Sequence, residues 1–274
     1  MTTDPMLPPP SPNDEMWRTM LLRNPRALRN RRIHLRIPSS PRCKACAAPF
    51  AGVGGILMPL LGHGRWAKNP KYCVGCFSML RANHGGAEVE CSLLFADVRG
   101  STALAEQMPP KEFNRLMGWF FDVASDVLVS HDAFVDKFVG DEIIGIFVPA
   151  MATDAHAKRA VDAAVALMQR TLRSKVGGRS IPIGAGVSTG IAYVGSIGMG
   201  RDTELTAMGD MVNTTARLAS AAGAGEILVT EAAAAAAGLP SSLERRSLQL
   251  KGKSGPTEVA VLTMTAPASQ GVDM

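Results

Sequence analysis

Two aspartates stand where an apolar segment ends in a glycine-containing turn. Asp97 follows the mainly apolar residues 92–96, and Asp141 follows Gly140 directly after the expected strand that ends at residue 139. A carboxylate at the end of a buried strand is costly unless a cation meets it. If the two strands lie side by side, their carboxylates are close enough to share hard divalent cations of the Mg²⁺ type. The sequence therefore predicts that Asp97 and Asp141 bind metal.

A third segment adds an amide and a guanidinium. Asn213 and Arg217 are four residues apart in residues 209–221, which we expect to be helical, so they share one face of that helix. Metal-binding carboxylates combined with a positioned arginine are typical of enzymes that transfer phosphoryl or nucleotidyl groups.

Four cysteines form two CxxC pairs, Cys43 with Cys46 and Cys73 with Cys76. Each pair presents two thiolates to one tetrahedral ion from a tight turn. In a cytosolic protein this spacing favours metal over disulfides. We expect a structural Zn²⁺ with four cysteine ligands. An iron–sulfur cluster, which also takes four thiolates, and a redox dithiol remain alternatives.

Two histidines and a fifth cysteine lie near these pairs. Because two complete CxxC pairs fill a tetrahedral site, we expect His63 and His84 to be ordinary surface or core side chains and not ligands. Cys91 alternates with Leu93 and Phe95 on an expected strand, so we expect it to be a small core residue.

The elements that must position these residues follow from hydrophobic periodicity and turn signals. Helices alternate with strands, yet hairpins also occur, so the sheet must be mixed or antiparallel and the fold class α+β. Expected strands cover residues 89–96, 133–139, 142–148, 181–187, 190–195, 226–230, 244–250 and 257–263, and expected helices cover 101–108, 111–129, 154–172, 209–221 and 231–237.

Composition describes a globular chain. Of its 274 residues, 46% are hydrophobic and 19% charged. No apolar run approaches the roughly 20 residues that span a bilayer. The proline-rich residues 1–12 lack the apolar core of a signal peptide. We therefore expect no transmembrane segment and a cytoplasmic location.

The net charge of +5 is concentrated near the N-terminus. Residues 1–42 hold eight arginines against three acidic residues. Such an arm either contacts an anionic surface, lipid or nucleic acid, or is a solvated arginine-rich helix or tail. A nucleic-acid-binding unit is disfavoured because the segment lacks the interleaved aromatic residues on which single strands stack.

The segment from residue 88 to residue 264 resembles the catalytic domain of class III nucleotidyl cyclases, the adenylyl and guanylyl cyclase family. It carries F-x-D-x-x-G-S/T around Asp97, K-x-x-G-D ending at Asp141, and G-D-x-V-N-x-x-x-R ending at Arg217, in the family's order. The resemblance implies a ferredoxin-like βαββαβ core with additional strands, preceded by a small metal-binding module. The expected organisation is a basic Pro/Arg-rich arm at 1–42, a zinc-ribbon-like four-Cys module at 43–84, a catalytic domain at 85–266 and a tail at 267–274.

By this resemblance, Asp97 and Asp141 hold two Mg²⁺ or Mn²⁺ ions, which activate the ribose 3′-hydroxyl for attack on the α-phosphate and steady the pyrophosphate leaving group. Arg217 is implied to stabilise the charge on the α-phosphate, and Asn213 to orient the ribose. The implied triphosphate contacts are Lys251 and the strand-to-helix turn of Gly100, Ser101 and Thr102. Ile191 stands where some members carry a phosphate-binding arginine, so one such contact is absent.

The resemblance implies that Lys137 and Thr206 recognise the nucleotide base. A lysine at the first position donates to adenine N1, whereas guanylyl cyclases carry a glutamate there. Thr206 stands where many adenylyl cyclases carry aspartate and guanylyl cyclases cysteine, a departure toward a subgroup with threonine. A hydroxyl still accepts the adenine N6 donor, so we expect ATP over GTP. That subgroup includes bicarbonate-responsive enzymes, which makes bicarbonate stimulation a hypothesis.

In the resembled family the active site lies between two catalytic domains, and one chain here carries both halves. The resemblance therefore implies a head-to-tail homodimer with two equivalent sites, converting ATP to 3′,5′-cyclic AMP and pyrophosphate as a signalling enzyme. The rival hypothesis is a degenerate cyclase domain that serves as a nucleotide-binding or scaffold module. The full set of metal, base, ribose and transition-state residues favours the enzyme.

Overall fold

The computed structural model describes residues 12–67, 70–176, 180–198 and 203–265. For residues 137–139 it describes the backbone alone. The start of the predicted arm and the predicted tail at 267–274 lie outside the described residues. The helices are α1 (Asp14–Leu22), α2 (Pro25–Leu35), α3 (Gly52–Leu57), the 3-10 helix η1 (Met58–Leu61), α4 (Val74–Ala82), α5 (Ser101–Gln107), α6 (Pro110–Ser130), α7 (Pro149–Ala152), the 3-10 helix η2 (Thr153–Ala155), α8 (His156–Arg173), α9 (Asp210–Ala221) and α10 (Glu231–Ala237). The strands are β1 (Gly86–Val98), β2 (Phe134–Val139), β3 (Glu142–Phe147), β4 (Ile183–Ile197), β5 (Glu204–Met208), β6 (Glu226–Thr230), β7 (Arg245–Leu248) and β8 (Thr257–Thr263).

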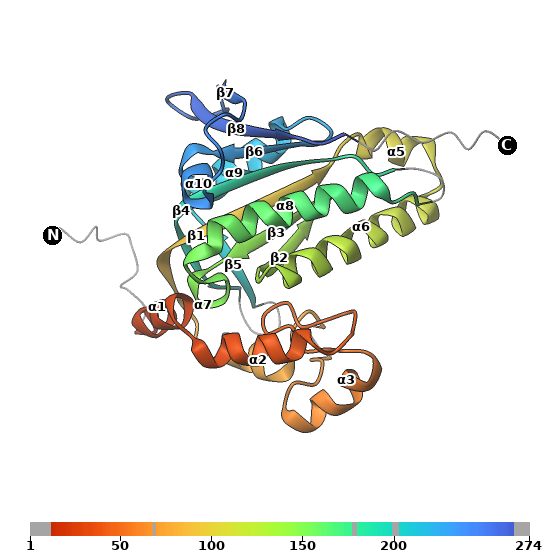
Figure 1. The fold of residues 1–274 in the computed structure, drawn as a ribbon. Coiled ribbons are helices and arrows are strands. Elements are labelled where there is room, and N and C mark those ends of the chain that lie inside the picture. Colours follow the sequence, from red (N-terminus) through yellow and green to blue (C-terminus); the bar gives the residue numbers. More distant parts are fainter. Residues whose placement is uncertain (1–11, 68–69, 177–179, 199–202, 266–274) are drawn as a thin grey trace.

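Within the described residues the strands form one mixed sheet in the order β2-β3-β1-β4-β6-β8-β7, with β5 added to β4. β4 and β6 run parallel, whereas β1 is antiparallel to both of its neighbours, β3 and β4 (Figure 1). The order β2-β3-β1-β4, with helices after β1 and β3, is the one that a βαββαβ unit produces. The predicted α+β class with a mixed sheet is therefore confirmed.

The two faces of the sheet are covered differently. Along β1, Leu94 and Ala96 point into a core that α6, α8 and α10 close, because successive side chains of a strand alternate between faces. Leu93 and Phe95 point to the opposite face, into a core shared with the N-terminal part of the chain. Cys91 belongs to this second core and is fully buried, as predicted, and burial raises the pKa of its thiol to about 12.

The N-terminal elements are packed onto the catalytic part of the chain. Trp17 of α1 is fully buried in the same core as Leu93 and Phe95 of β1, and its Nε1 donates to the carbonyl of Asn83 over 2.8 Å. Pro25 ends the pattern of the first helix, as its missing N–H requires, and begins α2. The described part of the predicted arm is thus structured, and whether residue 42 is a domain boundary stays a prediction.

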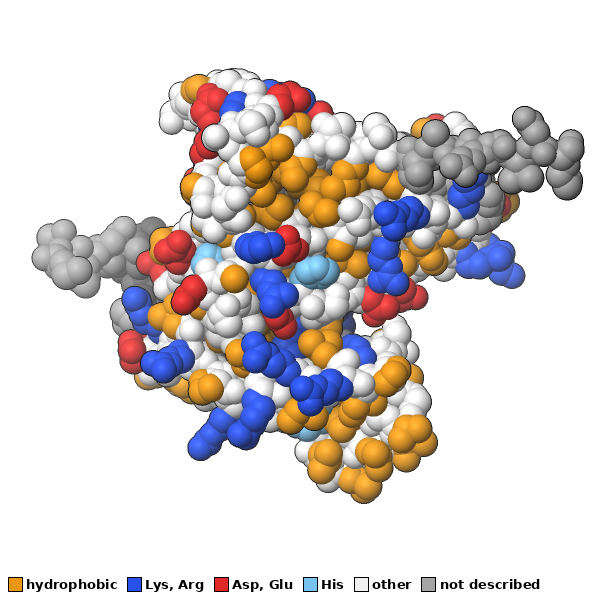
Figure 2. Space-filling model, in the orientation of Figure 1, with side chains coloured by type: hydrophobic (Ala, Val, Ile, Leu, Met, Phe, Trp, Pro, Cys, Tyr) orange, Lys and Arg blue, Asp and Glu red, His pale blue; other side chains and the backbone are white. Residues whose placement is uncertain are grey.

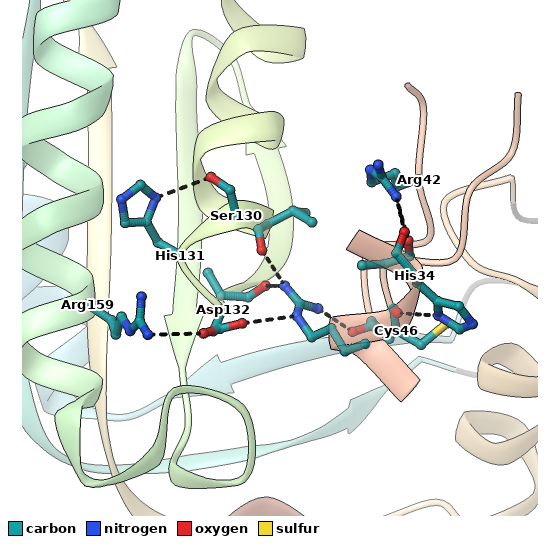
Figure 3. A network of polar contacts seen from close by, with 12 residues as sticks. His34, Arg42, Cys46, Ser130, His131, Asp132 and Arg159 are labelled. Atoms are coloured by element: carbon teal, nitrogen blue, oxygen red, sulfur yellow. Dashed lines mark hydrogen bonds and ion pairs between the residues drawn. The ribbon is translucent and has the colours of Figure 1, made fainter. Parts of the chain in front are cut away.

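One arginine of α2 is buried in the junction between these parts. The guanidinium of Arg31 donates to the carbonyl of Ala45 in the cysteine module, and to the carbonyls of Val129 and Ala133 at the turn between α6 and β2. Asp132 in that turn also faces Arg159 of α8, with 3.9 Å between Oδ2 and the guanidinium (Figure 3). Neighbouring contacts in the same network join His34 to the carbonyl of Cys46.

Two predicted strands proved to be one, and one strand was not predicted. The ladder between β1 and β4 runs without a break from Gly86–Gly195 to Val98–Ile183, so the expected interruption at 188–189 is wrong. Gly186 of β4 allows a helix to pack closely on the strand, since a Cβ there would lie 2.7 Å from the carbonyl oxygen of Thr215 in α9. The short strand β5 had no clear periodic signal.

Candidate active site

Three carboxylates gather where β1 ends beside the β2–β3 hairpin. Asp97 lies directly opposite Glu142 in the antiparallel register, so the two side chains share a face. Asp141 occupies the turn just before Glu142, and its carbonyl accepts from the amide of Val98 over 3.4 Å. Gly140 makes this turn with φ of +63°, a conformation that glycine adopts without steric cost. The predicted pairing of Asp97 with Asp141 is present in the fold.

This cluster concentrates negative charge. Burial, opposed by Arg99 and reinforced by Asp141, raises the pKa of Asp97 to about 6. Burial together with Asp97 and Asp141 raises the pKa of Glu142 to about 7. A set of oxygen donors that resist ionising together is suited to a hard divalent cation, which would relieve their mutual repulsion.

Arg99 links these carboxylates to α9. Its guanidinium donates to Asp97 Oδ2 over 2.8 Å, and also to the carbonyls of Ala219 and Ser220 at the end of the helix. The Arg99 guanidinium thus satisfies C-terminal carbonyls of α9, where positive charge is favourable. It also fixes the end of that helix relative to β1.

α9 displays the predicted amide and guanidinium one turn apart. Asn213 is exposed and Arg217 is half-buried. The guanidinium of Arg217 lies against the loop between β7 and β8, 3.3 Å from where a Cβ on Gly252 would stand. In the same loop Lys253 pairs with Asp210 at the start of α9. Lys251, exposed in this loop, is therefore brought to the same helix as Arg217.

The strands that carry the predicted base-recognition residues meet although they are not neighbours in the sheet. The hydroxyl of Thr206 on β5 donates to Asp136 Oδ2 on β2 over 2.7 Å. Thr206 is only 2% exposed and Asp136 only 3%. Lys137 follows Asp136 in β2, and its side chain lies outside the described residues.

The cysteine module packs directly behind these two strands. The hydroxyl of Tyr72 accepts from the amide of Leu205 over 3.3 Å, and Lys71 pairs with Glu204. On the other strand, Lys44 Nζ lies 3.5 Å from the carbonyl oxygen of Asp136. The module therefore touches β2 and β5 on either side of the Thr206 contact.

The four cysteines converge as predicted. The sulfurs of Cys43, Cys46, Cys73 and Cys76 all lie within 4.8 Å of one another. Hydrogen bonding to the Cys43 sulfur raises the pKa of both the Cys46 and the Cys76 thiols. Because a metal binds cysteine as the thiolate, metal binding would release protons from the cluster. The donor set fits one tetrahedral metal ion.

The histidines near the module do not complete it. His63 Nδ1 lies 3.5 Å from the Cys73 sulfur, a hydrogen-bonding distance for a thiolate, so His63 supports the cluster from outside. His84 is exposed, and its backbone carbonyl accepts from Asn13.

The remaining expected phosphate contacts lie beside the carboxylates. Gly100 has φ of +72° at the start of α5, and Ser101 and Thr102 begin that helix at the surface. Sequence reasoning missed Arg99, Glu142, Asp136 and Lys44 as members of the site. Arg99 and Glu142 had a signal, since each adjoins a predicted metal ligand within two residues.

Known proteins share this architecture. A family model described as the adenylate and guanylate cyclase catalytic domain matches residues 86–263. The chain belongs to this cyclase family. Adenylate cyclase 1 of Rhizobium meliloti (strain 1021) is 31% identical over 134 residues, which are 47% of this chain and 20% of that protein. The adenylate cyclase of Anabaena cylindrica is 30% identical over 179 residues, 59% of this chain and 34% of that protein.

Solved cyclase structures resemble the domain along most of their own length. The guanylyl cyclase Cya2 superposes with a TM-score of 0.61 at 28% identity, over 68% of this chain and 98% of that one. The adenylyl cyclase CyaB from P. aeruginosa shares the fold, with a TM-score of 0.57 at 24% identity over 68% of this chain and 99% of that one. The cyclase chain spans about a fifth to a third of the curated relatives it matches. Among its described helices, none has the length and apolar character needed to cross a bilayer.

Proposed function

We propose that this cyclase acts on ATP, releasing 3′,5′-cyclic AMP and pyrophosphate. The observation that carries the choice of base is the hydrogen bond from Thr206 to Asp136. A hydroxyl that donates its one hydrogen bond to a carboxylate can only accept hydrogen bonds from other groups. Adenine presents an N6 amino donor where guanine presents an O6 acceptor, so this arrangement favours adenine. Assignment to a threonine-bearing subgroup belongs to the same proposal.

Asp97 and Asp141 would hold the divalent cations, and Glu142 adds a third carboxyl beside them. When bound, two Mg²⁺ or Mn²⁺ ions would activate the ribose 3′-hydroxyl and stabilise the charge on the leaving pyrophosphate. Arg99 would keep the Asp97 carboxylate oriented and partly neutralised before the cations arrive. The oxygen-only donor set supports this assignment.

The remaining roles fall to α9 and the loop beside it. Arg217 would stabilise the negative charge that develops on the α-phosphate, and loss of one such donor typically costs about 10²–10³ in rate. Asn213 would orient the ribose from the same exposed face. Lys251 and the turn of Gly100, Ser101 and Thr102 would bind the triphosphate, and Lys137 would donate to adenine N1.

We propose further that the catalytic unit is a head-to-tail homodimer in which one chain supplies the carboxylates and the other supplies α9. The four cysteines would hold a structural Zn²⁺, with an iron–sulfur cluster as the alternative. Their convergence supports a metal without selecting between the two.

Turnover of ATP and GTP by the purified full chain with Mn²⁺ tests the proposed reaction. We expect cyclic AMP and pyrophosphate, at least tenfold less cyclic GMP, and no cyclic product from Asp97→Ala. Preference for GTP would overturn the base assignment while leaving the reaction intact. No cyclic product from dimeric, metal-replete protein would favour the scaffold hypothesis.

A further inference from the structure

The N-terminal part of the cyclase displays large apolar side chains at its surface. Val53 is 73% exposed, Ile56 74%, Leu57 49%, Leu60 82% and Leu61 66%, all on α3 and η1. These five residues, called here the apolar knuckle, are aliphatic and lie within nine positions of one another. Contiguous exposed apolar side chains of this kind mark a surface that binds something apolar.

The segment that carries the knuckle contains many basic residues and no acidic residue. Residues 16–84 contain ten arginines and three lysines, 13 of the chain's 29 cationic residues, and none of its 24 aspartates and glutamates. The rest of the chain is therefore acidic, with 24 carboxylates against the remaining 16 cations. Four thiolates holding one divalent ion would remove only two of those charges.

The positive charge faces outward and lies beside the knuckle. Along α2 and at its C-cap, exposed arginines are spaced by three or four residues and form one stripe: Arg26, Arg29, Arg32 and the C-cap Arg36. The end of α2 abuts α3, because the side chain of Ile37 lies 2.9 Å from where a Cβ on Gly54 would stand. Figure 2 shows Lys and Arg side chains gathered over this end of the molecule, next to hydrophobic side chains where α3 lies.

We propose that this surface docks on an anionic lipid bilayer, with the apolar knuckle entering the interface and the α2 stripe meeting the headgroups. Aliphatic side chains beside arginines are suited to a membrane interface, where apolar burial and attraction to anionic lipid add together. Nucleic acid would meet the arginines but would give the knuckle no apolar environment. A complementary protein would have to bring both an apolar pocket and acidic groups.

Sedimentation of the full chain with sucrose-loaded vesicles tests the proposal. One set contains phosphatidylcholine alone, and the other contains about 30% phosphatidylglycerol. We expect binding to the anionic vesicles to be at least tenfold stronger, and to weaken as salt rises, because the surface charges are screened.

Two variants separate the two parts of the surface. Leu60→Ser with Leu61→Ser should weaken binding about tenfold or more. Arg29→Gln, Arg32→Gln and Arg36→Gln together should weaken it on the order of 100-fold, since each arginine near an anionic surface contributes about fivefold. Matched controls are Ile197→Ser, at an exposed apolar position on β4, and the triple change Lys111→Gln, Arg115→Gln, Arg173→Gln on α6 and α8. Both controls should bind like the parent chain.

The outcomes distinguish the occupants. Because all substituted positions are exposed, we expect every variant to fold. An unchanged melting temperature and metal content will verify this. Wild-type protein that stays in the supernatant with anionic vesicles overturns the proposal, as does equal binding by the Leu60 and Leu61 double variant. If that double variant instead dissociates an oligomer seen by light scattering, and no vesicle binding occurs, the knuckle is an interface between copies.

Discussion

Arg31 Nε lies 3.8 Å from Asp132 Oδ1 across the junction between the N-terminal helices and the catalytic domain. Arg31 is fully buried, and burial lowers the pKa of its guanidinium while Asp132 opposes that shift. The buried cation is tolerated here because carbonyl oxygens from both sides of the junction accept hydrogen bonds from its guanidinium. The contact joins the two parts of the chain into one folded unit.

Replacing this arginine should destabilise the whole protein. Arg31→Met removes the donor to the carbonyls of Ala45, Val129 and Ala133 and leaves Asp132 with only the more exposed Arg159, so we expect a loss of about 3–5 kcal/mol in unfolding free energy. Urea unfolding followed by tryptophan fluorescence measures it. The neighbouring exposed change Arg32→Met is the control and should alter stability by less than about 0.5 kcal/mol. Equal effects of both changes would refute the role of Arg31.

Mixing two inactive chains tests the shared active site. Asp97→Ala removes a proposed metal ligand and Arg217→Ala removes the proposed transition-state donor, so each homodimer should be inactive. A heterodimer of the two contains one intact site, and an equimolar mixture should recover about a quarter of wild-type activity if dimers form at random. A mixture that stays inactive although heterodimers are present would show that each chain builds its own site.

Asp136 should govern base preference through Thr206. Asp136→Asn gives Thr206 an amide partner that also donates, so the hydroxyl is no longer held as an acceptor. We expect the ratio of kcat/KM for ATP over GTP to fall about tenfold, with KM for ATP rising more than kcat falls. Ser188→Ala, another buried polar position on a neighbouring strand, is the control for general disturbance and should leave the ratio unchanged. An unchanged ratio in Asp136→Asn would refute the argument.

The four-cysteine site should be required for folding of the N-terminal part. Cys46→Ser, or stripping with a chelator, should remove about one metal ion per chain. The melting temperature should then fall by about 10 °C or more, because each kcal/mol lost shifts it by roughly 2–4 °C in a chain of this size. Cys91→Ala, in the core but outside the cluster, should keep the metal. If elemental analysis finds iron and sulfide, the site holds an iron–sulfur cluster and not zinc.

Stability should also depend on pH through His156. Its Nδ1 lies 2.9 Å from the hydroxyl of Ser92, and burial lowers the pKa of its imidazole below the ordinary value of 6.5. The folded state thus prefers neutral His156, and its contribution is complete above pH 6.5 and lost as pH falls below that value toward the folded-state pKa. His156→Gln should flatten unfolding free energy against pH in this window. A variant with the wild-type slope would assign the dependence to other groups.

Sequence patterns were sufficient to propose the candidate residues whose placement depends on local structure. Asp97 and Asp141 were identifiable because each ends a strand, and Asn213 and Arg217 because helical spacing places them on one face. The contact of Thr206 with Asp136 was not predictable, since it joins strands that are not adjacent in the sheet. Arg31 shows a second limit of sequence-based prediction. An arginine-rich helix is expected to be solvated, and only the tertiary packing reveals that one of its arginines is buried.

Lys44 directly follows the metal-binding candidate Cys43, and its ammonium reaches the carbonyl of Asp136, whose side chain holds Thr206. If the cysteines bind metal and Thr206 selects the base, as proposed above, this contact would couple metal occupancy to nucleotide choice. Linkage is reciprocal: if metal binding strengthens the selection of adenine by some factor, adenine nucleotide must strengthen metal binding by the same factor. The rate at which such an enzyme forms cyclic nucleotide would then depend on the supply of the metal that the cysteines bind.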